Sequence, residues 1–111
     1  MPEEIVDSKR LILADETVLE DCECGYFNKT LWCSLKNIPF HEAFQYFSDV
    51  SKFNTVIFEM TVGDLTDRII YRGLERITAV QQNEFTVDVR LEGYSIQMER
   101  QRIHKDGGQT S

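Results

Sequence analysis

Alternation of apolar and polar residues is the feature that most constrains what this chain can fold into. It is clearest near the C-terminal end, where the sequence alternates Phe85, Val87, Val89 and Leu91 with Thr86, Asp88, Arg90 and Glu92. Successive side chains of a β-strand point to opposite faces, so this spacing predicts a strand with one buried and one exposed face. We expect Phe85 to face inward together with the three aliphatic residues.

Three more strands are predicted before residue 37. They cover residues 9–14, 18–27 and 30–36, with polar turns at residues 15–17 and 28–29. Short polar turns between strands favour antiparallel pairing. The first third of the chain is therefore expected to be a three-stranded antiparallel unit.

One helix interrupts the strands. After Pro39 the apolar spacing changes to that of a helix, with Phe40, Ala43, Phe44 and Phe47 on one stripe. Proline is accepted in or just before the first turn of a helix. We predict a helix of about three turns here, followed by a loop over residues 49–54.

Strands return after the helix. Residues 55–61 alternate again, and residues 67–80 are long for one strand and contain Gly73, which predicts a bulge or bend. Residues 94–103 fit a strand and a helix equally. The expected class is α+β, with one helix and about six mainly antiparallel strands in the order βββαβββ. A curled sheet that closes into a small barrel is preferred to an open sheet, because a bend at Gly73 suits a curling sheet.

Length and composition indicate a single globular unit. The chain has 111 residues, of which 41% are hydrophobic and 28% are charged. We expect one domain over residues 1–105 and a flexible tail over residues 106–111. No apolar run has the length that a membrane-spanning helix needs, and no secretory leader is recognised, so we expect an intracellular protein with no membrane partner.

The charge distribution is uneven. The formal net charge is −7, and between residues 3 and 23 eight acidic residues stand against only Lys9 and Arg10. Phosphate groups would be repelled by such a surface, so we expect no direct nucleic-acid binding. The acidic excess either keeps the protein soluble or forms a surface that fits a basic partner.

Cysteine and histidine are the candidates for chemistry. Cys22, Cys24, Cys33 and His41 are the ligand types of a tetrahedral zinc site, but Cys-x-Cys on a strand lacks the turn geometry of a zinc knuckle. We interpret the cysteines as free thiols in the core, expect no metal or other cofactor, and keep zinc as the alternative. Neither His41 nor His104 is accompanied by a recognisable nucleophile and carboxylate, as a catalytic histidine base would be. The motifs of phosphate-binding loops and metalloproteases are also missing, so we expect no enzymatic activity.

An aromatic group surrounds the predicted hairpin tip at residues 28–29. Trp32 should face outward because the residues on either side of it, Leu31 and Cys33, are expected to face the core. Tyr26 and Phe27 lie at or near the same tip. Large exposed aromatic side chains are typical of interface anchors. The sequence predicts an interface at Trp32, Tyr26 and Phe27, with burial of Trp32 under a second layer as the alternative.

A set of turn and core motifs runs through residues 11–91. In order, the motifs are residues 13–17, Gly25, Leu31-Trp32, residues 42–44 with 47–49, and residues 71–74. This pattern resembles small uncharacterised proteins encoded by phages and prophages of Firmicutes-like bacteria. The resemblance implies a phage or prophage origin and a location in the host cytoplasm or in the virion.

The sequence supports three functional hypotheses. The leading one is a non-enzymatic binding or assembly protein that uses strand edges and the aromatic patch to bind a protein partner or to form a homo-oligomer. The first alternative is an acidic inhibitor or decoy, in which carboxylates within residues 15–23 occupy a basic groove on a host protein that handles nucleic acid. The second is a small-molecule sponge that uses the end of a small barrel.

Overall fold

A computed structural model describes residues 8–104 of the chain. The predicted tail at residues 106–111 therefore lies outside the described residues, as do residues 1–7 at the start of the predicted domain. Within residues 8–104 there are nine strands and two short helices. The strands are β1 (Ser8–Ile12), β2 (Val18–Glu20), β3 (Cys22–Phe27), β4 (Thr30–Lys36), β5 (Thr55–Val62), β6 (Leu65–Arg72), β7 (Arg76–Gln82), β8 (Thr86–Glu92) and β9 (Gln97–His104). The helices, α1 (Phe40–Tyr46) and α2 (Val50–Phe53), connect β4 to β5.

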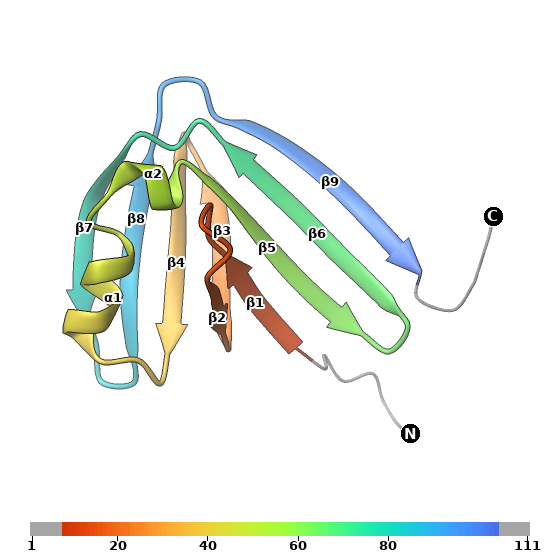
Figure 1. Cartoon of the computed structure of the whole chain (residues 1–111), viewed down its shortest axis with the longest axis horizontal. Helices are drawn as coiled ribbons and strands as arrows, with labels where there is room; N and C mark the ends of the chain where they lie inside the picture. Colours follow the sequence, from red (N-terminus) through yellow and green to blue (C-terminus); the bar gives the residue numbers. More distant parts are fainter. Residues whose placement is uncertain (1–7, 105–111) are drawn as a thin grey trace.

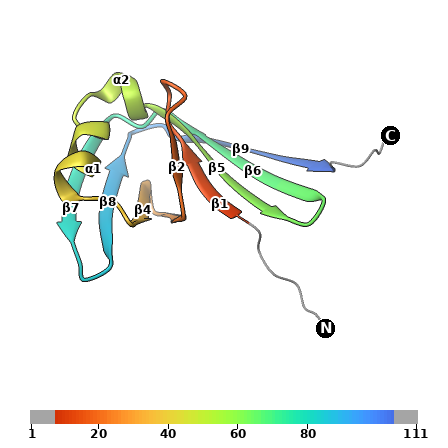
Figure 2. The ribbon, with the colours of Figure 1, turned by 60° about the horizontal axis from the view of Figure 1, so that its bottom comes forward.

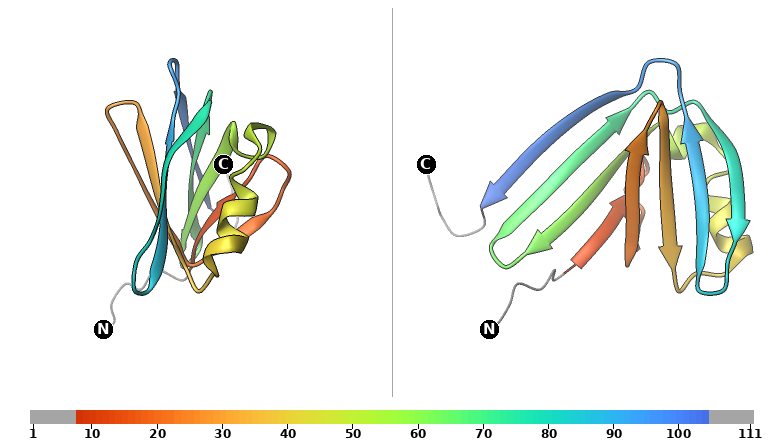
Figure 3. Two further views of the ribbon diagram at one scale, coloured as in Figure 1. Left: turned by 90° about the vertical axis from the view of Figure 1, so that its left-hand side faces the viewer. Right: turned by 180° about the vertical axis from the view of Figure 1, so that it is seen from behind.

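The strands form two antiparallel sheets. Sheet A has the order β2-β1-β5-β6-β9, and sheet B has the order β3-β4-β8-β7. The two sheets follow one another across a curved surface, with both helices on one side of it (Figure 1). Seen from behind, the strands run from β9 at one border to β7 at the other (Figure 3). No pairing within residues 8–104 joins β7 to β9, so the sheets do not close into a barrel.

The mainly antiparallel α+β class is confirmed, whereas six strands, the βββαβββ order and the preferred barrel are wrong. The chain changes sheet inside segments that look like single strands in the sequence. Asp21, with a φ of 56°, separates β2 in sheet A from β3 in sheet B. Gly73, with a φ of 90°, ends β6 and starts the crossover to β7. The ambiguous C-terminal segment forms a strand, β9.

Two crossovers between the sheets lie directly against each other. A Cβ atom on Gly93 would overlap the carbonyl oxygen of Gly73, and a Cβ atom on Gly73 would lie 2.7 Å from the carbonyl oxygen of Ser95. Only glycine allows backbones to approach this closely. The two glycines therefore join the sheets tightly at the end where β6 leads to β7 and β8 leads to β9.

The single helix predicted after Pro39 is two helices. Asp49 begins the second, because its carboxylate accepts a hydrogen bond from the backbone N–H of Ser51 at 3.0 Å. The loop expected over residues 49–54 thus contains α2. Ala43 and Phe47 are buried as expected, but Phe40 and Phe44 are exposed and stack on each other with ring centres 6.4 Å apart. A short helix buries only one row of side chains, and here Phe40 and Phe44 form the neighbouring row.

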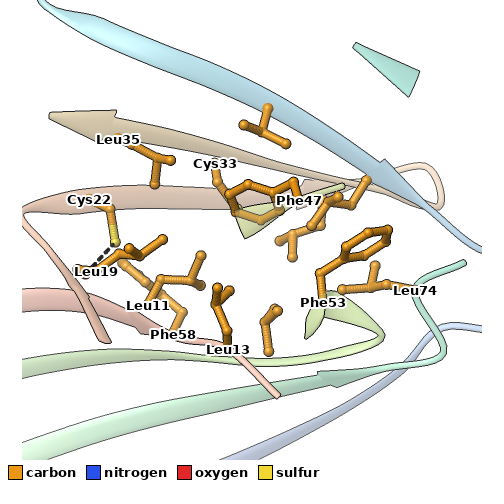
Figure 4. Packing of buried hydrophobic residues seen from close by; sticks show 14 of the residues in the cluster. Leu11, Leu13, Leu19, Cys22, Cys33, Leu35, Phe47, Phe53, Phe58 and Leu74 are labelled. Carbon is orange, nitrogen blue, oxygen red and sulfur yellow. Dashed lines mark hydrogen bonds between the residues drawn. The ribbon is translucent and has the colours of Figure 1, made fainter. Parts of the chain in front are cut away.

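The core lies between the inner faces of the sheets and the helices (Figure 4). Its side chains include Leu11 of β1, Leu31, Cys33 and Leu35 of β4, Phe47 directly after α1, Phe53 of α2, Val56 of β5, and Val87, Val89 and Leu91 of β8. The alternation predicted for residues 86–92 is confirmed. The prediction that Phe85 faces inward is wrong, because β8 begins at Thr86 and Phe85, in the turn before it, is 78% exposed.

Candidate binding site

Trp32 lies on the side of sheet B that faces away from the core. Its neighbours in β4, Leu31 and Cys33, are fully buried, whereas Trp32 is 43% exposed. The predicted outward orientation of Trp32 is confirmed. No second layer within residues 8–104 buries this side chain.

The indole ring of Trp32 lies over the backbone of Gly25 in the neighbouring strand β3. The two residues are opposite each other in the register of β3 and β4. A Cβ atom on Gly25 would lie 2.6–2.8 Å from the indole atoms Nε1, Cε2 and Cζ2. Glycine thus makes room for the ring to rest on β3, which holds the indole against the sheet and leaves much of it accessible to a partner.

Arg90 lies beside Trp32 on the other side, in strand β8. The register of β4 and β8 places the two residues opposite each other. Trp32 and Arg90 both line two shallow hollows. The remaining lining residues are Ala79, Gln81 and Asp88 in one hollow, and Phe27, Asn28 and Thr30 in the other. Arg90 is an exposed residue, and none of the ion pairs among residues 8–104 includes it.

The carboxylate of Asp88, two residues from Arg90 in β8, accepts hydrogen bonds from neutral donors. Its oxygens accept hydrogen bonds from the Ser34 hydroxyl at 2.7 Å, the Thr86 hydroxyl at 3.2 Å and the Asn83 amide. Glu92, the other acidic residue two positions from Arg90 in β8, pairs with Arg76, so Arg90 has no carboxylate partner among residues 8–104 and can bind one on a ligand. We call the surface formed by Phe27, Trp32, Ser34, Asp88 and Arg90 the Trp32 face.

The structure brings two of the three predicted interface residues together. Phe27 is 79% exposed at the end of β3 and lines one hollow with Trp32. Tyr26 points to the opposite side of the sheet, where its ring packs against that of Tyr71 with centres 5.8 Å apart. Tyr26 is thus not part of the Trp32 face, because adjacent residues of a strand point to opposite faces.

Arg90 was missing from the predicted site. The alternation of β8 places it on the outer face of its strand, but nothing in the sequence says that β8 pairs with β4 rather than with another strand. The position of Arg90 opposite Trp32 follows from that pairing alone.

The three cysteines gather on the inner face of the β3–β4 hairpin, whereas His41 is exposed on α1. The sulfur atoms of Cys24 and Cys33 are 3.3 Å apart, and the Cys22 thiol donates to the Leu19 carbonyl at 3.5 Å (Figure 4). No three His, Cys, Asp or Glu side chains within residues 8–104 are arranged to hold a metal ion. The neighbouring thiols and burial raise the pKa of Cys24 well above its usual range, which keeps this thiol protonated at neutral pH.

A separate hollow, away from the Trp32 face, gathers part of the acidic surface. It lies between β2 and α1, and its lining includes Glu20, Asp21, Glu42, Lys36 and Tyr46. The Tyr46 hydroxyl donates to a Glu42 carboxylate oxygen at 3.0 Å, and this hydrogen bond to the neutral phenol raises the pKa of Tyr46. Glu42, which comes from the helix, extends the acidic surface predicted within residues 15–23.

The two histidines lie far apart. His41 is in the first turn of α1, and His104 ends β9, which extends away from the helices (Figure 2). The structure therefore does not combine them in one site.

Comparisons with protein-family models, with curated proteins and with solved structures found no match to this chain. Among the helices of residues 8–104, none is long and apolar enough to cross a membrane.

Proposed function

We propose that this chain is a non-enzymatic binding or assembly protein whose docking surface is the Trp32 face. The observation that carries the proposal is the exposed indole of Trp32, which is held over Gly25 and flanked by Arg90, an arginine with no ion pair among residues 8–104. Tryptophan and arginine are the residue types that contribute most to protein interfaces. A protein surface that offers a carboxylate to Arg90 and an apolar side chain to the indole has the matching chemistry.

The outer strand borders are less suited to docking than the Trp32 face. Strand β7 shifts register between Ile77 and Ala79, and β9 carries Glu99, Arg100 and Arg102. Bulges and charged side chains oppose pairing at a sheet edge. We therefore place recognition on side chains of the Trp32 face and not on unpaired backbone groups at β7 or β9.

Substitution of Trp32 tests the proposal. Trp32→Ala should weaken self-association, or the affinity for an isolated protein partner, by about tenfold or more while leaving the fold intact, because the aromatic anchor is lost. Phe85→Ala is a matched control, since it removes an aromatic ring that is 78% exposed outside the Trp32 face. Sedimentation velocity and partner titration, with circular dichroism to check the fold, measure both variants.

Unchanged sedimentation and partner affinity in Trp32→Ala would overturn the proposal. An equal loss in Trp32→Ala and Phe85→Ala would also contradict it, because the effect would then not be specific to the Trp32 face.

The acidic hollow between β2 and α1 supports a second candidate, the inhibitory decoy of a basic groove. Glu20, Asp21 and Glu42 line this hollow together, so carboxylates from two elements are contiguous. Association through these charges should weaken steeply with salt, and Glu20→Gln combined with Asp21→Asn should reduce it while Trp32→Ala does not. The same titrations therefore separate the two candidates.

The sponge hypothesis lacks the closed barrel end on which it depends, since sheets A and B do not close. The phage or prophage origin implied by the resemblance, and the location in host cytoplasm or virion, stay predictions.

A further inference from the structure

The β3–β4 hairpin places two thiols directly opposite each other. Cys24 and Cys33 are partners in the register, and their sulfur atoms are 3.3 Å apart. This pair lies on the inner side of the hairpin, whereas Trp32 lies on the outer side. The chemistry of the two thiols is therefore independent of the proposed binding role.

The position of the pair within the hairpin suits a disulfide. The turn consists of Asn28 and Lys29, both with positive φ, so the flanking residues Phe27 and Thr30 form the pair that exchanges backbone hydrogen bonds. Because hydrogen-bonded and non-hydrogen-bonded pairs alternate along an antiparallel ladder, Cys24 and Cys33 occupy a non-hydrogen-bonded position. At such positions the Cα atoms approach to about 4.5 Å, within the range of about 4.4–6.8 Å seen for disulfides.

Cys22 is less suited to a disulfide with Cys24 or with Cys33. It lies two residues from Cys24 on the same strand, a Cα separation of about 6.7 Å, at the upper limit for a disulfide. Its thiol donates to the Leu19 carbonyl, and its own register partner is Leu35. The geometry selects Cys24 and Cys33 among the three thiols.

We propose that Cys24 and Cys33 form an oxidative modification site, a dithiol that a peroxide converts to a cross-strand disulfide. Cys22 and Cys33 are at most 1% exposed, whereas Cys24 is partly accessible, so Cys24 meets the oxidant first.

The reaction has two steps. The Cys24 thiolate attacks one peroxide oxygen and the O–O bond breaks. That oxygen keeps its hydrogen to give a sulfenic acid at Cys24, and the hydroxide that leaves takes up one proton to become water. The Cys33 sulfur then attacks the Cys24 sulfur, the S–S bond forms, and the S–O bond breaks with release of a second water. Two thiols are oxidised by two electrons in total, and one hydrogen peroxide is reduced to two water molecules.

The protonation of Cys24 sets the rate of the first step. The neighbouring thiols and burial raise the pKa of this thiol, so only a small fraction is thiolate at neutral pH. Oxidation should be slow at pH 7 and still accelerate through pH 9. Once formed, the bond draws the sulfur atoms from 3.3 Å to about 2.0 Å, a small movement for two opposed side chains.

Mass spectrometry of the folded full chain treated with hydrogen peroxide tests the site. We expect loss of two hydrogen atoms in the wild type and in the control Cys22→Ser, and peptide mapping should link Cys24 to Cys33. Cys24→Ser and Cys33→Ser should not form this intramolecular bond. Because Cys33 is buried and its variant is the one at risk of misfolding, mapping of the wild type provides the independent measurement.

Two results would overturn the proposal. One is a bond that involves Cys22 in the folded wild type. The other is folded wild type in which Cys24 and Cys33 stay reduced, or oxidise without linking, under conditions where the urea-unfolded chain forms disulfides.

Discussion

Replacing Gly25 by alanine tests how Trp32 is held on the sheet. The added Cβ would lie 2.6–2.8 Å from three atoms of the indole ring, so the ring must move away from β3. Gly25 is not among the glycines with positive φ, and the strain is therefore steric. Forcing an extra methyl group into a packed contact costs about 1–3 kcal/mol, and about 0.5–1 kcal/mol is recovered because alanine suits a strand better than glycine.

The expected net loss in free energy of unfolding is therefore about 0–2.5 kcal/mol, centred on about 1 kcal/mol. For a domain of 111 residues, a loss of about 1 kcal/mol lowers the thermal midpoint by about 4 °C. Trp32 is the single tryptophan of the chain, so its fluorescence reports on the same event. In Gly25→Ala the emission should shift to longer wavelength and acrylamide should quench it more strongly, because the displaced ring gains contact with water.

Gly63→Ala separates displacement of the indole from a general loss of stability. Gly63 has a φ of 58°, but a Cβ atom there would meet no atom within 4 Å. An L-residue in this conformation costs about 1–2 kcal/mol. We expect a similar fall in the thermal midpoint with unchanged Trp32 emission. Wild-type emission and stability in Gly25→Ala would refute the reasoning.

Two further predictions concern sheet A. Glu59 is 8% exposed, and its carboxylate lies 2.8 Å from Arg10 Nε and 3.0 Å from Arg68 Nε. Glu59→Gln should lower the free energy of unfolding in urea by about 1–3 kcal/mol, because two arginines lose their charged partner. The control Glu99→Gln alters an exposed pair with Arg72 and should change stability little, so equal losses in the two variants would contradict a special role of Glu59. Burial raises the pKa of Tyr71 from its ordinary value of 10.0 to about 12, and Tyr71→Phe should remove the tyrosinate absorbance that develops near pH 12. Because the folded state favours the neutral phenol, the stability that Tyr71 contributes below pH 10 should be lost as the pH rises toward 12. A wild-type protein in which all tyrosines have titrated well below pH 12 would refute this prediction.

Local patterns in the sequence were sufficient for the faces of the regular strands. The alternation in residues 30–36 and 86–92 correctly placed Leu31 and Val89 in the core and Trp32 outside. The polar pair Asn28 and Lys29 correctly marked a hairpin tip. These features depend on neighbours one or two residues apart, which is why a single sequence reveals them.

Errors arose where a local pattern continued across a change of sheet. Asp21 and Gly73 interrupt segments whose composition still resembles one strand, and the segment that forms β9 fits a strand and a helix equally, so the sequence predicts six strands where nine form. Phe85 fits the alternation of β8 but lies beyond the end of the core, where no partner side chain covers it. Tyr26 and Phe27 were grouped by proximity in sequence, although adjacent strand residues face opposite sides.

The sequence by itself determined a mainly antiparallel α+β fold, an outward-facing Trp32 and a hairpin that contains all three cysteines, because each depends on short-range spacing. Tertiary structure decided which strands became neighbours. The pairing of β4 with β8 placed Arg90 beside Trp32, and the register of β3 with β4 set Gly25 under the indole and Cys24 against Cys33. Strand pairing is governed by burial of side chains distant in sequence, which the period of a single segment does not encode.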